Sequence, residues 1–509
     1  MKYTMGIDIG TFETKGVLCD MSGNIISSEK MKHDLISPQP GFAEHDPLNQ
    51  WWREFCFISN ELIKQSGVDH SDIVGVGCSA IMCGLTFVDE DLNPLRNAIL
   101  YGIDTRCQAE IDQLNSEIGE KEIVRLCGEA LSVESFGPKM LWVKNHEPEV
   151  YKKTKYITMA PGFINLRLTG KNWVDGYSAS SSAPLYSNAK REWIPEMSPY
   201  VVPLELLPQI GYVCDVIGEV TETAADETGL KAGTPVICGT TDAGAEAFSG
   251  GITSPGETMV MYGSTIFVIH LTDKQTMGTL INSDNPLWKG DYIFPDSYAV
   301  FGAMATTGSL TRWLLDTLGN DYILRGKDTG EDIFNMLFEG VDRIPVGSDG
   351  LFVLPYFAGE RLPIKDPLAK GMIFGLNLRH TRDYIVRAAL EGIGYGLAQN
   401  LDEMKKCGVE INKVTAIGGG TKNPLWMRIM SDITGTPHRI LKNNAGASYG
   451  DAMLAALGTG YVSMDEVKQW NETAYRVEPN LKNTAYYEER KPIFKQLYEN
   501  TKDLMHLNL

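Results

Sequence analysis

The chain has 509 residues, of which 43% are apolar and 22% are charged, and this length exceeds a single hydrophobic core. The formal net charge of −19 argues against nonspecific binding to nucleic acid or to an anionic membrane surface. No apolar run reaches the roughly 18 residues of a membrane span. The N-terminus enters a strand pattern at once, so we expect no secretory signal and a cytoplasmic location.

Cysteine and histidine usage argues against disulfides and against zinc. The nine cysteines contain no CxxC pair, and several of them lie in apolar, strand-like runs. Free buried thiols in a reducing compartment are the expected outcome. The eight histidines form neither an HxxxH nor an HExxH pair, so the sequence predicts no zinc site.

The first predicted element is a β-hairpin over residues 3–20. Asp8 lies in its first strand, Gly10 and Thr11 form the turn, and Lys15 opens the second strand. Gly10 allows the backbone to approach anionic oxygens closely, while Thr11 and Lys15 supply a hydroxyl and a cation. Asp8 is placed to face a metal ion. The segment favours a phosphate-binding turn, with an ordinary hairpin as the alternative.

Strands and helices alternate through the first half of the chain. Strand patterns occur near residues 73–78, 84–89 and 234–239, and helical patterns near 47–66 and 106–126. This alternation favours α/β architecture. Residues 75–80 match the dinucleotide fingerprint GxGxxA, but a strand follows instead of the required helix, so the match is rejected. Neither a Walker GxxxxGK[ST] loop nor a protein-kinase motif set occurs.

Asp242 follows the strand at 234–239, in a turn of small residues. Ligands bind at the carboxyl ends of strands in open α/β sheets, which favours a catalytic role for this carboxylate. The alternative is that Asp242 is simply a helix N-cap.

The pattern begins again near residue 250. A strand ends in Gly263, Ser264 and Thr265, and another strand follows at 266–269. This loose echo of the N-terminal hairpin indicates two lobes of similar design. We expect an N-terminal lobe over 1–248 and a C-terminal lobe over 249–509, with a peripheral helical tail at 461–509.

A second glycine-rich turn lies near residue 420. Gly418, Gly419 and Gly420 follow an apolar run, and Asn423 with Pro424 predicts a helix start. A strand, a glycine turn and a helix N-terminus together favour a nucleotide site, with a plain tight turn as the alternative. The small residues at 444–457 predict a helix that packs closely, either beside a ligand or against another helix.

Taken together, these segments resemble the FGGY family of carbohydrate kinases over residues 4–460, nearest to its xylulokinase-like members. Further matching stretches are 44–52, 138–143, 355–363, 371–376 and 388–392. The resemblance implies a two-lobed α/β fold of the actin-like, ribonuclease-H type with a cleft between the lobes. It implies that sugar binds mainly on the first lobe and ATP mainly on the second, with Mg²⁺ as the metal.

The resemblance also implies roles for individual residues. Asp242 matches the general base that accepts the proton of a sugar hydroxyl, Asp8 matches the acidic residue linked to the metal, and both are metal-ligand candidates. The ATP-binding candidates are the first phosphate turn (Gly10, Thr11, Lys15), the second phosphate turn (Gly263, Ser264, Thr265) and the nucleotide turn (Gly419, Gly420, Asn423). Phosphoryl transfer needs in-line positioning and charge neutralisation, which these groups would supply.

The sugar-facing positions depart from the xylulokinase pattern. Met82 and Cys83 replace a Met-His pair, Asp104 and Arg106 follow an apparent one-residue insertion, and residues 161–163 replace Lys-Asp-Tyr. Met82, Cys83, Asp104 and Arg106 remain the substrate-binding candidates. We expect an ATP-dependent kinase of a small sugar or polyol, with a ketopentose favoured.

Two alternatives keep the same scaffold. One is a nucleotide- or sugar-binding regulator that has lost transfer activity, and the other is an ATP hydrolase. Family resemblance further suggests a homodimer, with no nucleic-acid or membrane partner.

Overall fold

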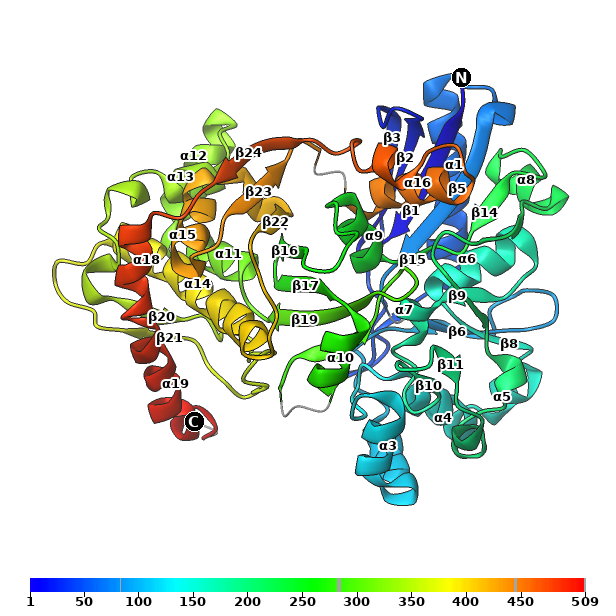
Figure 1. The fold of residues 1–509 in the computed structure, drawn as a ribbon, viewed down its shortest axis with the longest axis horizontal. Helices are drawn as coiled ribbons and strands as arrows, with labels where there is room; N and C mark the ends of the chain where they lie inside the picture. The colour runs from blue at the N-terminus through cyan, green and yellow to red at the C-terminus, as the bar shows by residue number, and fades with distance from the viewer. Residues whose placement is uncertain (83, 282–284, 444–445, 508–509) are drawn as a thin grey trace. The chain divides into compact units, whose positions relative to one another are not determined.

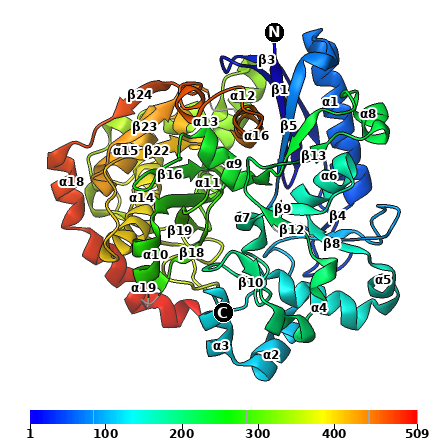
Figure 2. The same cartoon turned by 45° about the vertical axis from the view of Figure 1, so that its right-hand side comes forward.

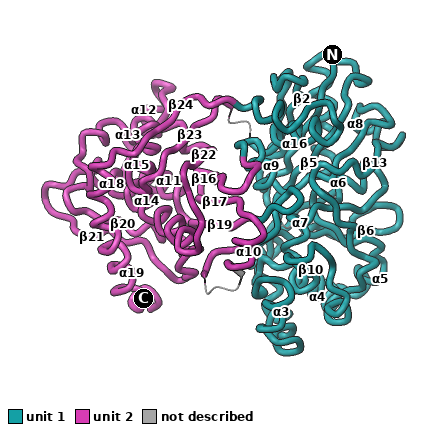
Figure 3. The backbone as a smooth tube through the Cα atoms, viewed as in Figure 1, with its two compact units in different colours: residues 1–251, 290–298, 445–471 teal, residues 252–289, 299–444, 472–509 magenta. Residues whose placement is uncertain are grey.

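The computed structural model describes residues 1–82, 84–281, 285–443 and 446–507. The chain forms two compact units (Figure 3). Unit 1 comprises 1–251, 290–298 and 445–471, and unit 2 comprises 252–289, 299–444 and 472–509. This division differs from the expected one at 248/249, because two segments of the second half return to unit 1.

The main sheet of unit 1 has seven strands. Its order is β13 (Val216–Glu219), β14 (Pro235–Ile237), β5 (Ile73–Ala80), β1 (Tyr3–Ile9), β2 (Glu13–Asp20) and β3 (Ile25–Lys32), with β15 (Thr240–Thr241) also paired to β5. Strands β1 and β2 are antiparallel, whereas β1 and β5 are parallel. The predicted N-terminal hairpin is therefore present, with Asp8 near the carboxyl end of β1.

Helices α1 (Arg53–Ser66) and α16 (Gly446–Gly458) cover opposite faces of this sheet (Figures 1 and 2). A Cβ built on Gly6 of β1 would meet the backbone of α16, whereas one built on Gly16 of β2 would meet side chains of α1. Gly16 pairs with Ile7, and consecutive residues of a strand point to opposite faces. The small-residue helix thus packs against strands β1 and β5 and helix α9 (Asp242–Ser249).

The rest of unit 1 is built on smaller sheets. A four-stranded sheet runs β4 (Glu44–His45), β7 (Ala98–Ile99), β6 (Leu85–Val88) and β8 (Tyr156–Met159), and two-stranded pairs join β9 (Trp173–Asp175) to β12 (Gln209–Gly211) and β10 (Tyr186–Ser187) to β11 (Glu192–Trp193). Its other helices are α2 (Gln108–Leu114), α3 (Glu120–Cys127), α4 (Phe136–His146), α5 (Pro148–Lys153), α6 (Ala160–Thr169), α7 (Gly176–Ala179), α8 (Glu222–Thr228) and α17 (Met464–Val467).

Unit 2 repeats the topology of the first sheet. Its main sheet runs β18 (Trp288–Asp291), β19 (Tyr298–Met304), β17 (Ile266–Thr272), β16 (Thr258–Tyr262), β22 (Val414–Ile417), β23 (His438–Leu441) and β24 (Thr473–Val477). Strands β16 and β17 are antiparallel, and β16, β22 and β23 are parallel. The tip of the β18–β19 hairpin belongs to unit 1.

Helices and one further strand pair complete unit 2. The helices are α10 (Lys274–Ile281), α11 (Gly308–Leu318), α12 (Asn320–Thr329), α13 (Ile333–Phe338), α14 (Arg382–Lys406), α15 (Pro424–Thr434), α18 (Leu481–Glu488) and α19 (Lys491–Met505), and β20 (Phe352–Leu354) pairs with β21 (Met372–Phe374). The tail expected to be helical contains strand β24, which pairs with β23. Residues 461–471 belong to unit 1 instead of forming part of that tail.

Candidate active site

Asp8 is held at the end of strand β1 in a buried, acidic environment. The residue is 7% exposed, and Ser79 Oγ on the neighbouring strand β5 lies 3.2 Å from its Oδ1. Burial, followed by the charge on Asp242, raises the pKa of Asp8 to about 8, while Lys15 acts in the opposite direction. The charge of Asp242 thus acts on Asp8, and both carboxyl groups lie in unit 1.

Asp242 occupies the first position of helix α9. The side chain of the preceding Thr241 caps this helix by accepting a hydrogen bond from the Gly244 amide at 3.3 Å. Asp242 itself accepts hydrogen bonds from the amides of Ala243, at 2.7 Å, and Met82. The N-cap role considered for Asp242 thus belongs to its neighbour. Burial raises the pKa of Asp242 to about 6, against the effect of the two amides.

Two further carboxyl groups join this cluster, and the sequence analysis did not identify either of them. Glu246 lies one helical turn beyond Asp242, and burial together with the Asp242 charge raises its pKa to about 7. Asp451, on helix α16, is fully buried, and its Oδ2 accepts hydrogen bonds from Ser79 Oγ at 2.6 Å and from the Ser79 amide at 3.0 Å. Ser79 thus bridges Asp451 and Asp8.

The sequence contains a local signal for Glu246 but none for Asp451. The i, i+4 spacing on one helix face could have pointed from Asp242 to Glu246. Asp451 lies in a segment with no local acidic motif, and only the packing of α16 on the sheet brings it to Ser79.

The cluster fits a divalent cation through its charge. Within the described residues, no preformed group of three or more His, Cys, Asp or Glu side chains could hold a metal ion. Mg²⁺ often binds through only one or two carboxylates together with phosphate oxygens and water. Asp8 and Asp242 are therefore the right type and number of protein ligands for such a site. A cation would also favour the ionised forms of carboxyl groups whose pKa values burial has raised.

The first phosphate turn is the tip of the β1–β2 hairpin. The Gly10 amide donates to the Glu13 carbonyl at 3.0 Å, which leaves Thr11 and Phe12 at the tip. Lys15 is half exposed, and its Nζ lies 3.5 Å from Glu13 Oε1. The positive charge of Lys15 lowers the pKa of both Asp8 and Glu246, so this lysine is close enough to the acidic cluster to stabilise its ionised forms.

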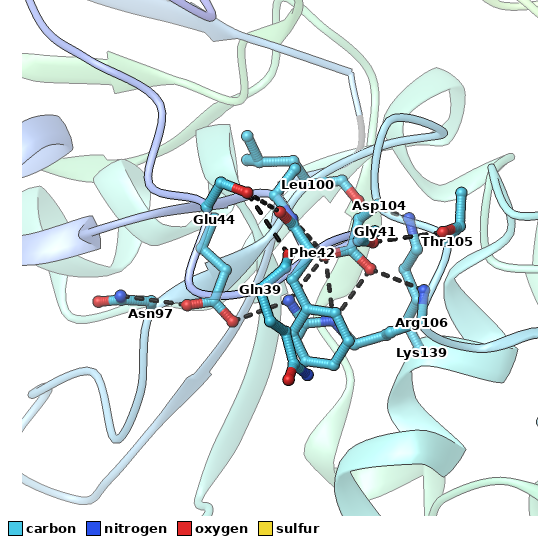
Figure 4. Close-up of polar contacts among 12 residues, drawn as sticks. Gln39, Gly41, Phe42, Glu44, Asn97, Leu100, Asp104, Thr105, Arg106 and Lys139 are labelled. Carbon is cyan, nitrogen blue, oxygen red and sulfur yellow. Dashed lines mark hydrogen bonds and ion pairs between the residues drawn. The ribbon is translucent and has the colours of Figure 1, made fainter.

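Two of the sugar-side candidates, Asp104 and Arg106, form a separate polar network in unit 1 (Figure 4). Asp104 is fully buried, and its carboxylate accepts hydrogen bonds from the Ala43 amide, at 2.8 Å, and from Arg106 Nε and Nη2. Arg106 Nη2 also contacts Glu44 Oε1 at 2.8 Å, and its guanidinium lies 3.8 Å from the centre of the Phe42 ring. These contacts fasten the segment at 41–44 to the segment at 104–106.

The two remaining sugar-side candidates are Met82 and Cys83. Met82 contacts Asp242 through its amide, as described above. Cys83 lies outside the described residues.

The other two predicted turns lie in unit 2. At Gly263–Thr265, between β16 and β17, the carbonyls of Gly263 and Ser264 accept hydrogen bonds from Thr307 and Ser309 at the start of helix α11. Ser264 itself is exposed.

The nucleotide turn begins after strand β22 at Gly418, whose φ of 89° suits a glycine. Asn423 caps helix α15 by accepting from the Trp426 amide at 3.0 Å, and Pro424 is the first helical residue. This helix start is the one predicted from the sequence. A Cβ on Gly419 would meet no described atom within 4 Å, so the turn is open at this residue.

Family models match both units in sequence order. The N-terminal domain model of the FGGY family of carbohydrate kinases matches residues 3–249, and the C-terminal domain model matches residues 258–459. The chain therefore belongs to the FGGY family of carbohydrate kinases. It has the mixed α/β, actin-like two-domain fold of that family and is a phosphotransferase, and membership of this kinase family implies the use of ATP.

Individual relatives are consistent with this assignment. The chain is 30% identical to the xylulose kinase of Bacillus subtilis (strain 168) over 513 aligned residues, which cover 99% of this chain and 98% of that protein. The crystal structure of xylulose kinase from Rhodospirillum rubrum has a TM-score of 0.88 at 29% identity and covers 99% of this chain and 100% of that chain.

A more distant structure shows the same fold. Glycerol kinase from Plasmodium falciparum, solved with ADP, has a TM-score of 0.85 at 23% identity, and the match covers 100% of this chain and 99% of that one. Among the described residues, none of the helices is both long and apolar enough to cross a membrane.

Proposed function

We propose that this carbohydrate kinase transfers the γ-phosphoryl group of Mg-ATP to a hydroxyl of a small ketose or polyol, with a ketopentose favoured. The observation that carries the proposal is the position of Asp242, whose half-buried carboxylate begins helix α9 and is coupled electrostatically to Asp8. The xylulose kinase relatives favour a ketopentose. The departures from the xylulokinase pattern at Cys83 and at residues 161–163 keep a related polyol as a second candidate substrate.

Each residue of the cluster has a distinct proposed role. Asp242 accepts the hydroxyl proton as the nucleophilic oxygen attacks, and Asp8, with Asp242, holds Mg²⁺. Mg²⁺ held there would supply charge neutralisation to the phosphate groups, and Lys15 adds a positive charge near the same carboxylates. The turns at Gly10–Thr11 in unit 1, and at Gly263–Thr265 and Gly419–Asn423 in unit 2, are proposed to bind phosphate or nucleotide through backbone amides and hydroxyls.

The raised pKa of Asp242 suits a general base. A carboxylate with a pKa of about 6 is mostly ionised at neutral pH and is a stronger proton acceptor than one with an ordinary pKa of 3.8. The base acts in its ionised form, so kcat/KM for the sugar should fall by about tenfold per pH unit below the pKa of Asp242.

The test is a screen that couples ADP release to a panel of pentuloses, polyols and sugar acids. Asp242→Asn should lower kcat by about 10²–10⁴-fold while the melting temperature is kept, and chelation of Mg²⁺ should abolish turnover. Asp226→Asn, on the exposed side of helix α8, is the matched control and should behave as wild type. Full activity of Asp242→Asn would refute the assignment of the base, and ADP release that no sugar stimulates would refute the kinase reaction.

A further inference from the structure

Two histidines hold the carbonyl oxygens of the first phosphate turn. His33 Nε2 lies 3.1 Å from the Gly10 carbonyl, and His45 Nε2 lies 3.1 Å from the Thr11 carbonyl. A carbonyl oxygen only accepts, so each ring nitrogen must donate. Both imidazoles are buried, with 3% of the His33 side chain and none of His45 exposed. The proposed ATP chemistry assigns these histidines no role.

These contacts fix the direction of the amide groups at the tip. Both peptide bonds of the tip are trans, and in a trans peptide the N–H points opposite to the C=O. The histidines hold the Gly10 and Thr11 carbonyls on one side, so the Thr11 and Phe12 amides face the other. Within the described part of the chain, neither amide donates to a protein acceptor. Two parallel, unpaired amides are a typical anion cradle.

The tautomer of His45 is set by a third residue. Trp51 Nε1 donates to His45 Nδ1 at 3.1 Å, and an indole nitrogen can only donate. The proton of a neutral His45 must therefore reside on Nε2, where it is needed for the Thr11 carbonyl. Burial, and then the neighbouring His33, lower the pKa of His45 to about 4, so this ring stays neutral near pH 7.

His33 is held by an acceptor at both ends. Its Nδ1 lies 2.9 Å from Glu54 Oε2 on helix α1, and the same oxygen accepts from Thr14 Oγ1 at 2.6 Å. These two contacts fix the orientation of the His33 ring between helix α1 and the turn. The two rings are 4.8 Å apart and nearly perpendicular.

We propose that His33 and His45 are positioning residues that aim the Thr11 and Phe12 amides at a phosphate group of ATP. The inference rests on the proposed function, because that function supplies the anion. Phosphoryl transfer depends on positioning, so a turn that is braced before ATP binds does not have to be ordered on binding. Glu54 orients the His33 ring toward the Gly10 carbonyl, so the brace should be sensitive to replacement of Glu54.

The first test compares replacements of His45 by binding of Mg-ATP, measured by calorimetry. His45→Leu removes both hydrogen bonds, and the dissociation constant should rise about tenfold or more. His45→Gln keeps a donor for Thr11 and an acceptor for Trp51, and it should stay within about threefold of wild type. His146→Leu removes another histidine paired with a carboxylate, Glu110, and should leave binding unchanged.

A second variant covers the case in which His45→Leu does not fold. Glu54→Gln keeps an acceptor for Thr14 and His33 but replaces the carboxylate by a neutral amide, which holds the His33 ring less firmly. Its dissociation constant for Mg-ATP should rise several-fold. A brace that serves stability alone would lower the melting temperature and leave the dissociation constant of the folded protein unchanged.

The outcomes separate this inference from the proposed function. If wild type phosphorylates a sugar while His45→Leu and Glu54→Gln bind Mg-ATP as wild type does, the positioning role is refuted and the kinase reaction stands. If no sugar is phosphorylated but nucleotide affinity follows the histidines with rescue by Gln, the positioning role stands and the proposed reaction is refuted. Equal loss with His45→Gln and His45→Leu would also refute the positioning role.

Discussion

The contact between Gly6 of strand β1 and helix α16 supports a sharp prediction for Gly6→Ala. A Cβ at this position would lie 2.0 Å from the Ser448 carbonyl oxygen and 2.4 Å from the Ala452 amide nitrogen. Both are backbone atoms, so no side-chain rotation can relieve the overlap. The helix would have to retreat from the sheet by about 1.5 Å to reach ordinary contact distance.

The cost follows from the burial of this contact. Strand β1 is buried along most of its length, and α16 is buried over its central turns. Overpacking a well-packed core typically costs about 1–3 kcal/mol, and we expect the upper end because the obstacle is backbone. For a chain of this size the shift is roughly 1–2 °C per kcal/mol, so the melting temperature should fall by about 3 °C or more.

The assay is thermal unfolding of purified wild type and Gly6→Ala, with Gly278→Ala as the matched control. Gly278 lies in helix α10, and a Cβ there meets no described atom within 4 Å. Alanine is the better helix former by about 1 kcal/mol, so the control should be neutral or slightly stabilised. A Gly6→Ala protein that melts within about 1 °C of wild type would show that α16 does not lie as close to β1 as described.

Three further predictions concern buried polar groups. Burial raises the pKa of Glu360 from 4.5 to about 7, so its folded form gains protons relative to the unfolded chain, and stability should fall as pH rises from about 4.5 to 7. The total fall over this interval is about 3 kcal/mol, and Glu360→Gln should remove it in urea unfolding at several pH values; an unchanged dependence on pH would contradict burial of Glu360 as the cause. Arg106→Lys loses the two-point contact with Asp104 and should lower the free energy of unfolding by about 3 kcal/mol, whereas a loss below about 1 kcal/mol would contradict the buried network. Burial raises the pKa of the Cys78 thiol well above its usual range, so a thiol reagent should modify it only after unfolding, and mass spectrometry of native protein checks this.

Local signals predicted the elements that carry the site. The hairpin with Asp8 at the end of its first strand, the strand at β5 and the start of helix α15 behind Asn423 all depend on residues close together in the chain. Turn chemistry, alternating burial and helix caps act over a few residues, so a single sequence reveals them.

Long-range packing accounts for what the sequence did not reveal. Asp451 reaches Ser79 only because α16 returns to the first sheet, and the glycine at position 6 that permits this approach lies far from it in the chain. The same return explains why the unit boundaries differ from the expected division. No periodicity within 444–457 could indicate which sheet this helix would cover.

For Asp104 and Arg106, the sequence does not distinguish a ligand-binding role from a structural one. An acid and an arginine two residues apart suggest a polar ligand site. When both side chains are buried, however, they can also use their hydrogen-bonding groups on each other. Here Arg106 also contacts Glu44 and two aromatic rings, so the pair has a clear role in joining two loops. A sugar contact by either residue stays a prediction, and it would have to be made in addition to these bonds.

The site in unit 1 depends on one edge of one sheet. Strand β1 ends near Asp8, the parallel strand β5 ends near Ser79, and the parallel strand β15 leads directly into Asp242. Parallel strands necessarily bring their carboxyl ends to the same edge, so the register between them sets the spacing of the three side chains. Helix α16 braces this edge on one face through Asp451, and the two histidines brace the adjoining turn. A perturbation of either brace should therefore alter phosphate chemistry before it unfolds the sheet, because the strands keep their own hydrogen bonds when the brace is lost.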